Sequence, residues 1–331
     1  MKKRLMVFFM LLALLISTLT GCDKAGGKQK VVLNEVAHSI FYAPLYVAIE
    51  NGYFKEQGIT LELVTGFGAD KTMTALLSKE ADIGLMGGES TIYTYQNGMQ
   101  DYAVNFAQLT QRAGNFMVAR QKDDSFTYDK LKGKTVLGGR PGGMPEMVFE
   151  YILKKHGMDP KTDLTIEQRI DFGTTAAAFY SGQGDYTVEN EPHDNALEEK
   201  GDGVVVSSLG KESGYVPYTS FSARQSFLEE NPETIQAFTD ALQKGMEYVN
   251  THTPAEIAKS IAPQFSETEI STLETIVKRY KDCDSWKKDL IFEKDSFTLL
   301  QDILMDAGTI TERAPYEDLV NTAFAQSASN K

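Results

Sequence analysis

Hydrophobic and polar positions alternate with two different periods along the first half of the chain. Ile59, Leu61 and Leu63 are separated by single polar residues, which is the pattern of a strand with one buried face. Met73 and Leu76 instead recur at helical spacing. Because strand-like and helical runs follow each other in turn, the pattern predicts βαβ units and a largely parallel sheet covered by helices. The expected strands are 31–36, 59–63 and 81–86, and the expected helices are 44–51 and 71–78.

A second series of the same kind begins after about Arg120. A glycine-rich turn, 138–143, precedes Met147, Val148 and Ile152, which recur at helical spacing. The strands expected here are 134–137, 164–170, 186–189 and 204–206, with a helix at 144–156. After Thr219 we expect helices only, at 232–251, 254–262, 267–280, 294–306 and 316–325. Such a tail is too helical to form a third α/β lobe.

The two series predict an α/β fold of two lobes joined by two crossings of the chain, near residues 119 and 219. Lobe one would comprise 31–118 plus 219–331, and lobe two would comprise 119–218. The cleft between two such lobes is a usual place for a small-molecule site. The alternative is two independent domains in series. This arrangement is disfavoured because the C-terminal tail has no predicted strands of its own.

Length and composition agree with a two-lobed globular protein, apart from the first residues. The chain has 331 residues, of which 42% are hydrophobic and 24% charged, and a chain of this length usually divides its core. Residues 1–21 have a basic start and an apolar run, 5–15, shorter than the roughly 20 residues that span a bilayer, so they predict a secretion signal. The ending Leu19-Thr20-Gly21-Cys22 resembles the bacterial lipobox, which implies lipid on Cys22. The alternative is an ordinary signal peptide with a chance cysteine.

After the predicted secretion signal, which we call the leader, residues 22–30 are mostly small and polar, and they predict a flexible tether. The net charge of the chain excludes some classes of partner. The net charge of −13 becomes −16 without the three basic residues of 1–21. A chain so acidic does not favour nucleic acid or anionic lipid surfaces. Four scattered histidines, the lack of CxxC or HExxH, and a Cys283 without a disulfide partner argue against a zinc site. We expect no metal and no cofactor.

Several segments resemble one protein family. They are Phe41–Ala48 (FYAPLYVA), Gly52–Ile59 (GYFKEQGI), Ala75–Gly84 (ALLSKEADIG) and Asp129–Val136 (DKLKGKTV). They are similar to the substrate-binding proteins of the nitrate/sulfonate/taurine and thiamine-pyrimidine type. The resemblance implies the type II periplasmic-binding-protein fold and a monomeric, lipid-anchored receptor on the outer face of the cell membrane. It would deliver a small molecule to an ABC permease and its ATPase, and it would not be an enzyme. Members bind unlike molecules, so the resemblance does not name the ligand.

Three turns at predicted helix starts carry most of the candidate ligand contacts. Aromatic residues in the first could stack on a flat ligand or only pack beneath the helix, and the acid in the second could contact ligand or only the positive helix N-terminus. The third lacks the spacing of a dinucleotide fingerprint or a P-loop, and is either a helix N-terminus open to an anionic or carbonyl group or a plain tight turn. The candidates are Ser39, Phe41, Tyr42, Gly88, Glu89, Ser90, Gly139, Gly142, Gly143 and Met144.

A fourth candidate element is the end of the 186–189 strand, where Glu189 and Glu191 would share a face while Asn190 points away. A sulfonate or nitrate receptor should avoid carboxylates that face its anion, whereas an aminopyrimidine offers an amino group and a ring nitrogen that a Glu can bind. Together with Glu89, these acids favour a thiamine-precursor pyrimidine as the ligand. The alternatives are an alkanesulfonate, taurine or nitrate receptor with merely superficial acids, or an exported enzyme on the same fold.

Overall fold

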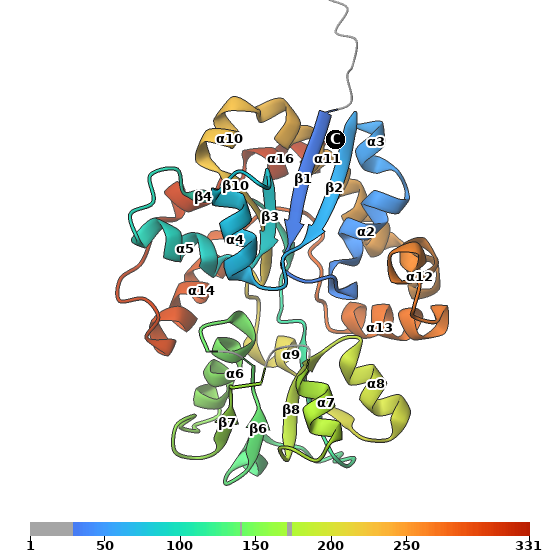
Figure 1. Cartoon of the computed structure of the whole chain (residues 1–331), viewed down its shortest axis with the longest axis vertical. Coiled ribbons are helices and arrows are strands. Elements are labelled where there is room, and N and C mark those ends of the chain that lie inside the picture. Colours follow the sequence, from blue (N-terminus) through green and yellow to red (C-terminus); the bar gives the residue numbers. More distant parts are fainter. Residues whose placement is uncertain (1–28, 140, 171–173) are drawn as a thin grey trace, which may run out of the picture.

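The alternating pattern folds into two five-stranded sheets, one in each of two lobes that lie one above the other in Figure 1. The structure, a computed structural model, describes residues 29–139, 141–170 and 174–331. The predicted leader, Cys22 and most of the tether lie outside the described residues. Within the described part, no helix is long and apolar enough to cross a membrane.

The sheet of lobe one has the order β2-β1-β3-β10-β4. Its strands are β1 (Gln29–Glu35), β2 (Ile59–Thr65), β3 (Ile83–Met86), β4 (Ala103–Thr110) and β10 (Thr219–Arg224). β1 runs parallel to β2 and β3, and β10 runs antiparallel to β3 and β4. All residues of β3, β4 and β10 are buried, as expected for strands covered on both faces.

The expectation that strands end at Thr219 is wrong, because β10 is a fully buried strand of lobe one. Its sequence, TSFSAR, has too many polar residues to look like a core strand. Ser220 and Ser222 nevertheless lie in the interior, where their hydroxyls donate to Asn105 Oδ1 at 2.6 and 2.9 Å. Because each buried hydroxyl has a partner, the strand stays in the core despite its polarity.

The sheet of lobe two has the order β7-β6-β8-β5-β9. Its strands are β5 (Asn115–Ala119), β6 (Thr135–Leu137), β7 (Thr165–Glu167), β8 (Tyr186–Asn190) and β9 (Val204–Ser208). β6 is parallel to β7 and β8, and β5 is antiparallel to β8 and β9. Each sheet therefore has four strands that run in one direction and one antiparallel strand, in the fourth position.

The two crossings between the sheets lie at 111–114 and 214–218, between β4 and β5 and between α9 (Leu209–Ser213) and β10. The predicted boundary after residue 118 is too late by one strand, because β5 pairs with β8 and β9 of lobe two. Gly114 in the first crossing has no room for a side chain, since a Cβ there would lie 2.8 Å from Phe41 Cζ. The first crossing therefore packs directly against Phe41 in the short helix 40–42 of lobe one.

Helices cover both sheets, and the C-terminal helices pack mainly on lobe one. The predicted helix 316–325 is two short helices instead, because Val320 between them forms a β-bridge with Asn105. In lobe one the helices are η1 (Ile40–Tyr42), α2 (Ala43–Glu50), α3 (Tyr53–Glu56), α4 (Ala69–Leu77), α5 (Glu89–Gln96), α10 (Gln225–Glu230), α11 (Pro232–Thr251), α12 (Pro254–Ile261), η3 (Ala262–Phe265), α13 (Ile270–Asp282), α14 (Lys294–Ala307), α15 (Tyr316–Leu319) and α16 (Ala323–Ser329). In lobe two they are η2 (Tyr128–Leu131), α6 (Met144–Lys155), α7 (Thr175–Tyr180), α8 (His193–Lys200) and α9.

Candidate functional site

A cavity of about 620 Å³ lies between the lobes. The carboxyl ends of β1, β2, β3 and β8 reach it, together with the start of α6 and both crossings. This is the position where ligands bind in α/β proteins, since strand ends and helix starts converge there. The lining comes from the segments 36–42, 67–71, 87–89, 114–115, 143–145, 190–193, 218–219 and from Tyr280.

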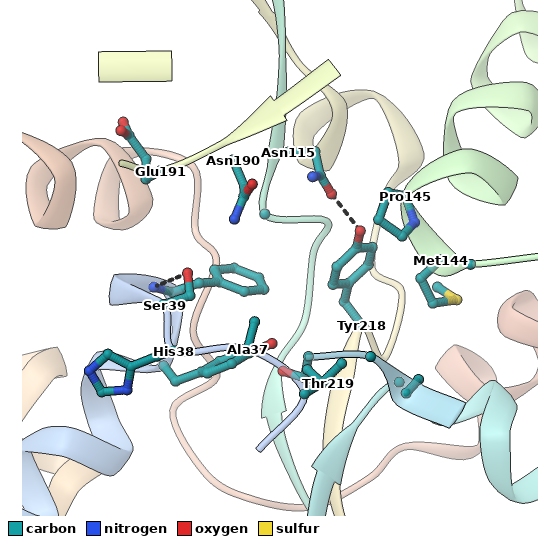
Figure 2. Close-up of a pocket in the computed structure, with 18 of the residues that line it drawn as sticks. Ala37, His38, Ser39, Asn115, Met144, Pro145, Asn190, Glu191, Tyr218 and Thr219 are labelled. Atoms are coloured by element: carbon teal, nitrogen blue, oxygen red, sulfur yellow. Dashed lines mark hydrogen bonds between the residues drawn. The ribbon is translucent and has the colours of Figure 1, made fainter. Parts of the chain in front are cut away.

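The first predicted turn lines the cavity with Ser39, Phe41 and Tyr42. Ser39 caps η1, because its Oγ accepts a hydrogen bond from the Phe41 N–H at 3.3 Å (Figure 2). The Phe41 ring packs 5.0 Å from the Tyr280 ring and 5.9 Å from the Tyr218 ring, measured between centroids. These aromatic rings therefore pack in the core and also form one wall of the cavity, and their stacking on a ligand stays a prediction.

In the second predicted turn, Glu89 lines the cavity while Gly88 and Ser90 do not. Gly87 takes the place expected for Gly88, and the Glu89 carboxylate lies over it so closely that a Cβ on Gly87 would clash. Ser90 does not cap α5, which has Gly88 at its N-cap and no side-chain cap. The glycine at position 87 thus makes room for the Glu89 carboxylate.

Glu89 is buried without full hydrogen bonding. The residue is 4% exposed, and its Oε2 has no hydrogen-bond partner among the described residues. Burial raises the pKa of Glu89 to about 7. A buried acceptor without a partner costs free energy unless something else binds it. Glu89 is therefore suited to receive a hydrogen-bond donor from a molecule in the cavity.

The third predicted turn contributes Gly143 and Met144 to the lining, whereas Gly139 and Gly142 lie outside it. Gly139 and Gly142 have φ angles of 88° and 76°, so they serve the tight turn that precedes α6. The Gly142 N–H donates to Glu146 Oε2 at 3.1 Å. The positive N-terminus of α6 already faces this acid of its own first turn, and it is therefore poorly suited to an anionic ligand.

The end of β8 differs from the prediction, because Asn190 and not Glu189 faces the cavity. Glu189 is buried on the other side of the strand, where its carboxylate accepts hydrogen bonds from Thr187 at 2.5 Å and Thr175 at 3.1 Å. In Figure 2 the Asn190 amide points toward the space between Ser39 and Tyr218. Glu189 and Asn190 thus face opposite sides of the strand, and the side assigned to the cavity was the wrong one.

Glu191 lines the cavity at its edge, but its carboxylate points away from the other lining residues in Figure 2. Its Oε1 contacts Arg279 Nη1 at 2.6 Å, and its Oε2 accepts a hydrogen bond from the Asn195 N–H at 3.3 Å. Both oxygens thus already have partners within the protein. Of the three acids predicted to bind a ligand, Glu89 alone lines the cavity with an oxygen that lacks a partner among the described residues.

Sequence reasoning missed the polar residues that the crossings bring to the cavity. Tyr218 and Asn115, one from each crossing region, lie side by side, and the Tyr218 hydroxyl donates to Asn115 Oδ1 at 2.5 Å (Figure 2). Placing the crossings correctly would have drawn attention to both. Phe67 was also missed; it lies at the cavity rim, 73% exposed and with a φ of 56°.

Positive charge is scarce around the cavity. Lys71 is the only Lys or Arg among the described lining residues, and it is exposed at the rim. Burial lowers the pKa of His193, so this histidine is neutral at pH 7. His38 bonds Glu35 at 2.8 Å, which raises the pKa of this histidine, and the Gln264 carbonyl at 2.9 Å. The cavity therefore presents aromatic faces, amides and the Glu89 carboxyl.

The family model described as NMT1/THI5 like matches residues 40–257. The chain belongs to this family. It is 44% identical over 96% of its length to "Putative binding protein YtlA" of Bacillus subtilis (strain 168), of which the match covers 95%. It is also 25% identical to the 4-amino-5-hydroxymethyl-2-methylpyrimidine phosphate synthase of Aspergillus parasiticus, over 63% of each chain.

Solved structures confirm the predicted periplasmic-binding-protein fold of this NMT1/THI5-like protein. The alkanesulfonate-binding protein SsuA of Xanthomonas axonopodis pv. citri, bound to MOPS, aligns with a TM-score of 0.72. The alignment covers 89% of this chain and 98% of that one, at 16% sequence identity. An identity this low shows the shared fold and leaves the ligand to be argued from the cavity itself.

Proposed function

We propose that the protein is an extracytoplasmic solute receptor of an ABC importer and that its cavity binds an aminopyrimidine of the thiamine-precursor type. The observation that carries the ligand class is Glu89, a buried carboxyl in a cavity walled by aromatic rings, one oxygen of which has no partner among the described residues. Secretion and anchoring through Cys22 are part of the same proposal and rest on the leader sequence. Docking on a membrane permease and its ATPase follows from the receptor role.

The polar groups around the cavity match the edge of an aminopyrimidine. The amino group and a protonated ring nitrogen are neighbouring donors, and one carboxylate can accept from both. Asn115 and Asn190 offer further donors and acceptors at other points of the wall. Phe41 and Tyr42 offer flat faces against which a single ring can stack.

The same groups disfavour a sulfonate or nitrate. Such an anion would lie near the Glu89 carboxylate without a buried cation from the described lining residues to offset it. Lys71 is too exposed to supply more than a weak, screened attraction. The fold shared with an alkanesulfonate-binding protein therefore does not carry that protein's ligand to this chain.

A ligand panel tests the proposal on the full-length protein purified in detergent. Unfolding temperature and calorimetric binding would be measured with 4-amino-5-hydroxymethyl-2-methylpyrimidine, taurine, an alkanesulfonate and nitrate. A ligand at about 100 times its dissociation constant stabilises the folded state by roughly 2.7 kcal/mol. We expect stabilisation by the pyrimidine alone. Stabilisation by taurine or the alkanesulfonate without the pyrimidine would reject the ligand class, and conversion of any of these compounds into a product would reject the receptor role.

A further inference from the structure

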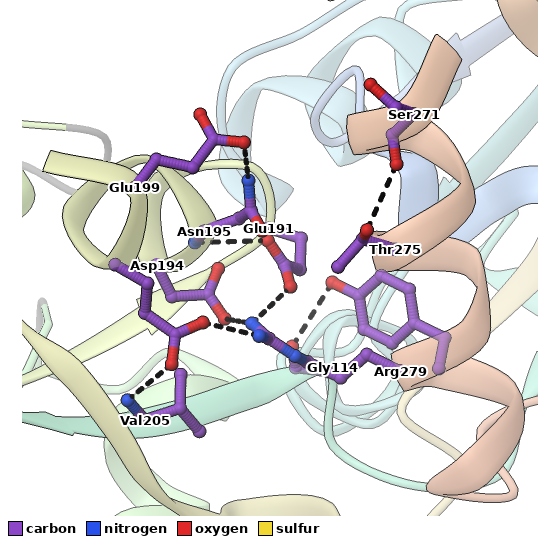
Figure 3. A network of polar contacts seen from close by, with 11 residues as sticks. Gly114, Glu191, Asp194, Asn195, Glu199, Val205, Ser271, Thr275 and Arg279 are labelled. Carbon is purple, nitrogen blue, oxygen red and sulfur yellow. Dashed lines mark hydrogen bonds and ion pairs between the residues drawn. The ribbon is translucent and has the colours of Figure 1, made fainter. Parts of the chain in front are cut away.

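One guanidinium joins three carboxylates behind the Glu191 wall of the cavity (Figure 3). Arg279 Nη1 lies 2.6 Å from Glu191 Oε1 and 3.2 Å from Asp194 Oδ2. Arg279 Nη2 lies 2.5 Å from Glu198 Oε2. We call these four residues the Arg279 network. The planar guanidinium group of Arg279 contacts all three acids at once, which the single ammonium group of a lysine could not do with the same geometry.

Every ion pair of the Arg279 network crosses between the lobes. Arg279 lies on α13, which packs against α12 of lobe one and whose Lys281 donates to the Val249 and His252 carbonyls. The three acids lie after β8 and on α8 in lobe two. A neighbouring bond, from Thr272 to Glu199 at 3.0 Å, also joins α13 to α8. This flank of the cleft is therefore held closed by polar contacts centred on one side chain.

The Arg279 network has three acids for one base and is mostly buried, and burial raises the pKa values of Glu191 and Asp194. The side chains of Glu191 and Asp194 are 0% exposed, and that of Arg279 is 21% exposed. Asp194 Oδ1 has no hydrogen-bond partner among the described residues. The Phe116 ring of β5, 5.6 Å from the guanidinium carbon, borders Arg279 on another side. Without the guanidinium, the buried acids would be uncompensated, and separation of the lobes would return them to water.

We propose that Arg279 is a positioning residue: it latches the two lobes together and, through Glu191, fixes the segment 190–193 as a wall of the cavity. Closure of the cleft and occupancy of the cavity are then coupled, because a ligand held by this wall and the latch both favour the closed form. The effect on ligand affinity rests on the proposed function, whereas the effect on closure does not depend on the identity of the ligand.

The test compares three variants of the full-length protein in small-angle scattering without ligand and in calorimetry with the aminopyrimidine. Arg279→Gln removes the latch charge, and Arg279→Lys keeps the charge but loses the fork. Lys154→Gln is the matched control, because Lys154 pairs with Asp306 at 2.8 Å across the other flank, from α6 to α14, outside the cavity lining. Circular dichroism checks that each variant folds.

We expect Arg279→Gln to enlarge the radius of gyration of the ligand-free protein and to weaken aminopyrimidine binding roughly ten-fold or more, about 1.4 kcal/mol. Arg279→Lys should recover part of both effects, and Lys154→Gln should leave both near those of the unmodified protein. If Arg279→Gln does not fold, Glu198→Gln takes its place in the test. Glu198→Gln removes one contact at the partly exposed edge of the network, so it should change the radius of gyration and the affinity in the same direction by a smaller amount.

An unchanged radius of gyration in Arg279→Gln, or in Glu198→Gln where that variant replaces it, would overturn the latch. Equal shifts in Arg279→Gln and Lys154→Gln would also overturn it, since any interlobe ion pair would then act alike. If the unmodified protein binds no aminopyrimidine, the proposed ligand is wrong. The small-angle scattering of the ligand-free variants then still decides whether Arg279 latches the lobes.

Discussion

Replacing Glu89 with glutamine tests both the electrostatics of the cavity and its ligand. The substitution keeps the shape of the side chain and exchanges one acceptor oxygen for a donor NH2 group. Glu89 is 4% exposed, and no described residue bonds its Oε2, so the change acts on a desolvated group at the cavity wall. Its effects on stability and on binding should therefore have opposite signs near neutral pH.

The stability effect follows from the pKa. Burial raises the pKa of Glu89 from the usual 4.5 to about 7, and at 1.36 kcal/mol per unit this difference corresponds to about 3 kcal/mol. Below about pH 4.5 the carboxyl is protonated in both folded and unfolded chains, and the penalty is absent. Between 4.5 and 7 the folded chain binds more protons, so its stability falls as pH rises. Glu89→Gln should remove this fall, so that above about pH 7 the variant has a higher free energy of unfolding than the unmodified protein.

The binding effect has the opposite direction. A hydrogen bond to a charged group contributes about 1.5–3 kcal/mol, so loss of the carboxylate should weaken aminopyrimidine binding roughly 10- to 150-fold. Glu189→Gln is the matched control, because burial raises the pKa of Glu189 to about 7 as well, yet its carboxylate faces Thr175 and Thr187 and lies outside the cavity lining. Denaturant unfolding near pH 5 and pH 8, with calorimetry of each variant, gives both readouts. Equal affinities in Glu89→Gln and the unmodified protein would refute the role of Glu89.

Three further substitutions test other parts of the structure. Tyr218→Phe removes the donor to Asn115 Oδ1 and should lower the unfolding free energy by about 1 kcal/mol and weaken ligand binding, as measured by denaturation and calorimetry. Phe67→Ala should weaken binding of a flat ligand by about 1 kcal/mol while leaving the unfolding free energy unchanged, because Phe67 is 73% exposed at the rim; equal binding would place it outside the site. Thr253→Ala breaks the capping box with Glu256 at the start of α12 and should lower stability by about 1 kcal/mol in thermal unfolding, with ligand affinity unchanged.

The periodic segments of the sequence predicted their helices and strands well, whereas the buried strands that contain polar residues were not predicted. Pro44 at the start of α2 and the apolar face of α6 gave boundaries within one residue of the structure. β10 was missed because Ser220 and Ser222 are buried by virtue of a partner, Asn105, more than a hundred residues away. Single-sequence patterns report local periodicity and carry no information on such distant hydrogen bonds.

The sequence singled out three turns near the cavity, but it did not determine which of their residues line it. Ser39, Glu89 and Met144, one from each of these turns, line the cavity, since strand ends of an α/β lobe meet at one edge. Which residues of each turn face inward depends on local backbone geometry: Gly142 turns the chain, whereas Gly143 lines the cavity. Tyr218 ends one crossing and Asn115 follows the other as the first residue of β5, and the position of the crossings depends on how β5 pairs in the second sheet.

The three acids singled out by the sequence have separate environments, and this separation constrains the ligand. Glu189 bonds to threonines within lobe two, and Glu191 bonds to Arg279 across the cleft. Only Glu89, among these three, keeps an oxygen without a partner in the described residues while lining the cavity. The proposed aminopyrimidine would direct one donor edge at Glu89 and offer flat faces to Phe41 and its neighbours. A molecule with negative charge at that edge would instead add a second uncompensated charge beside a buried carboxyl, at a cost that the described walls do not offset.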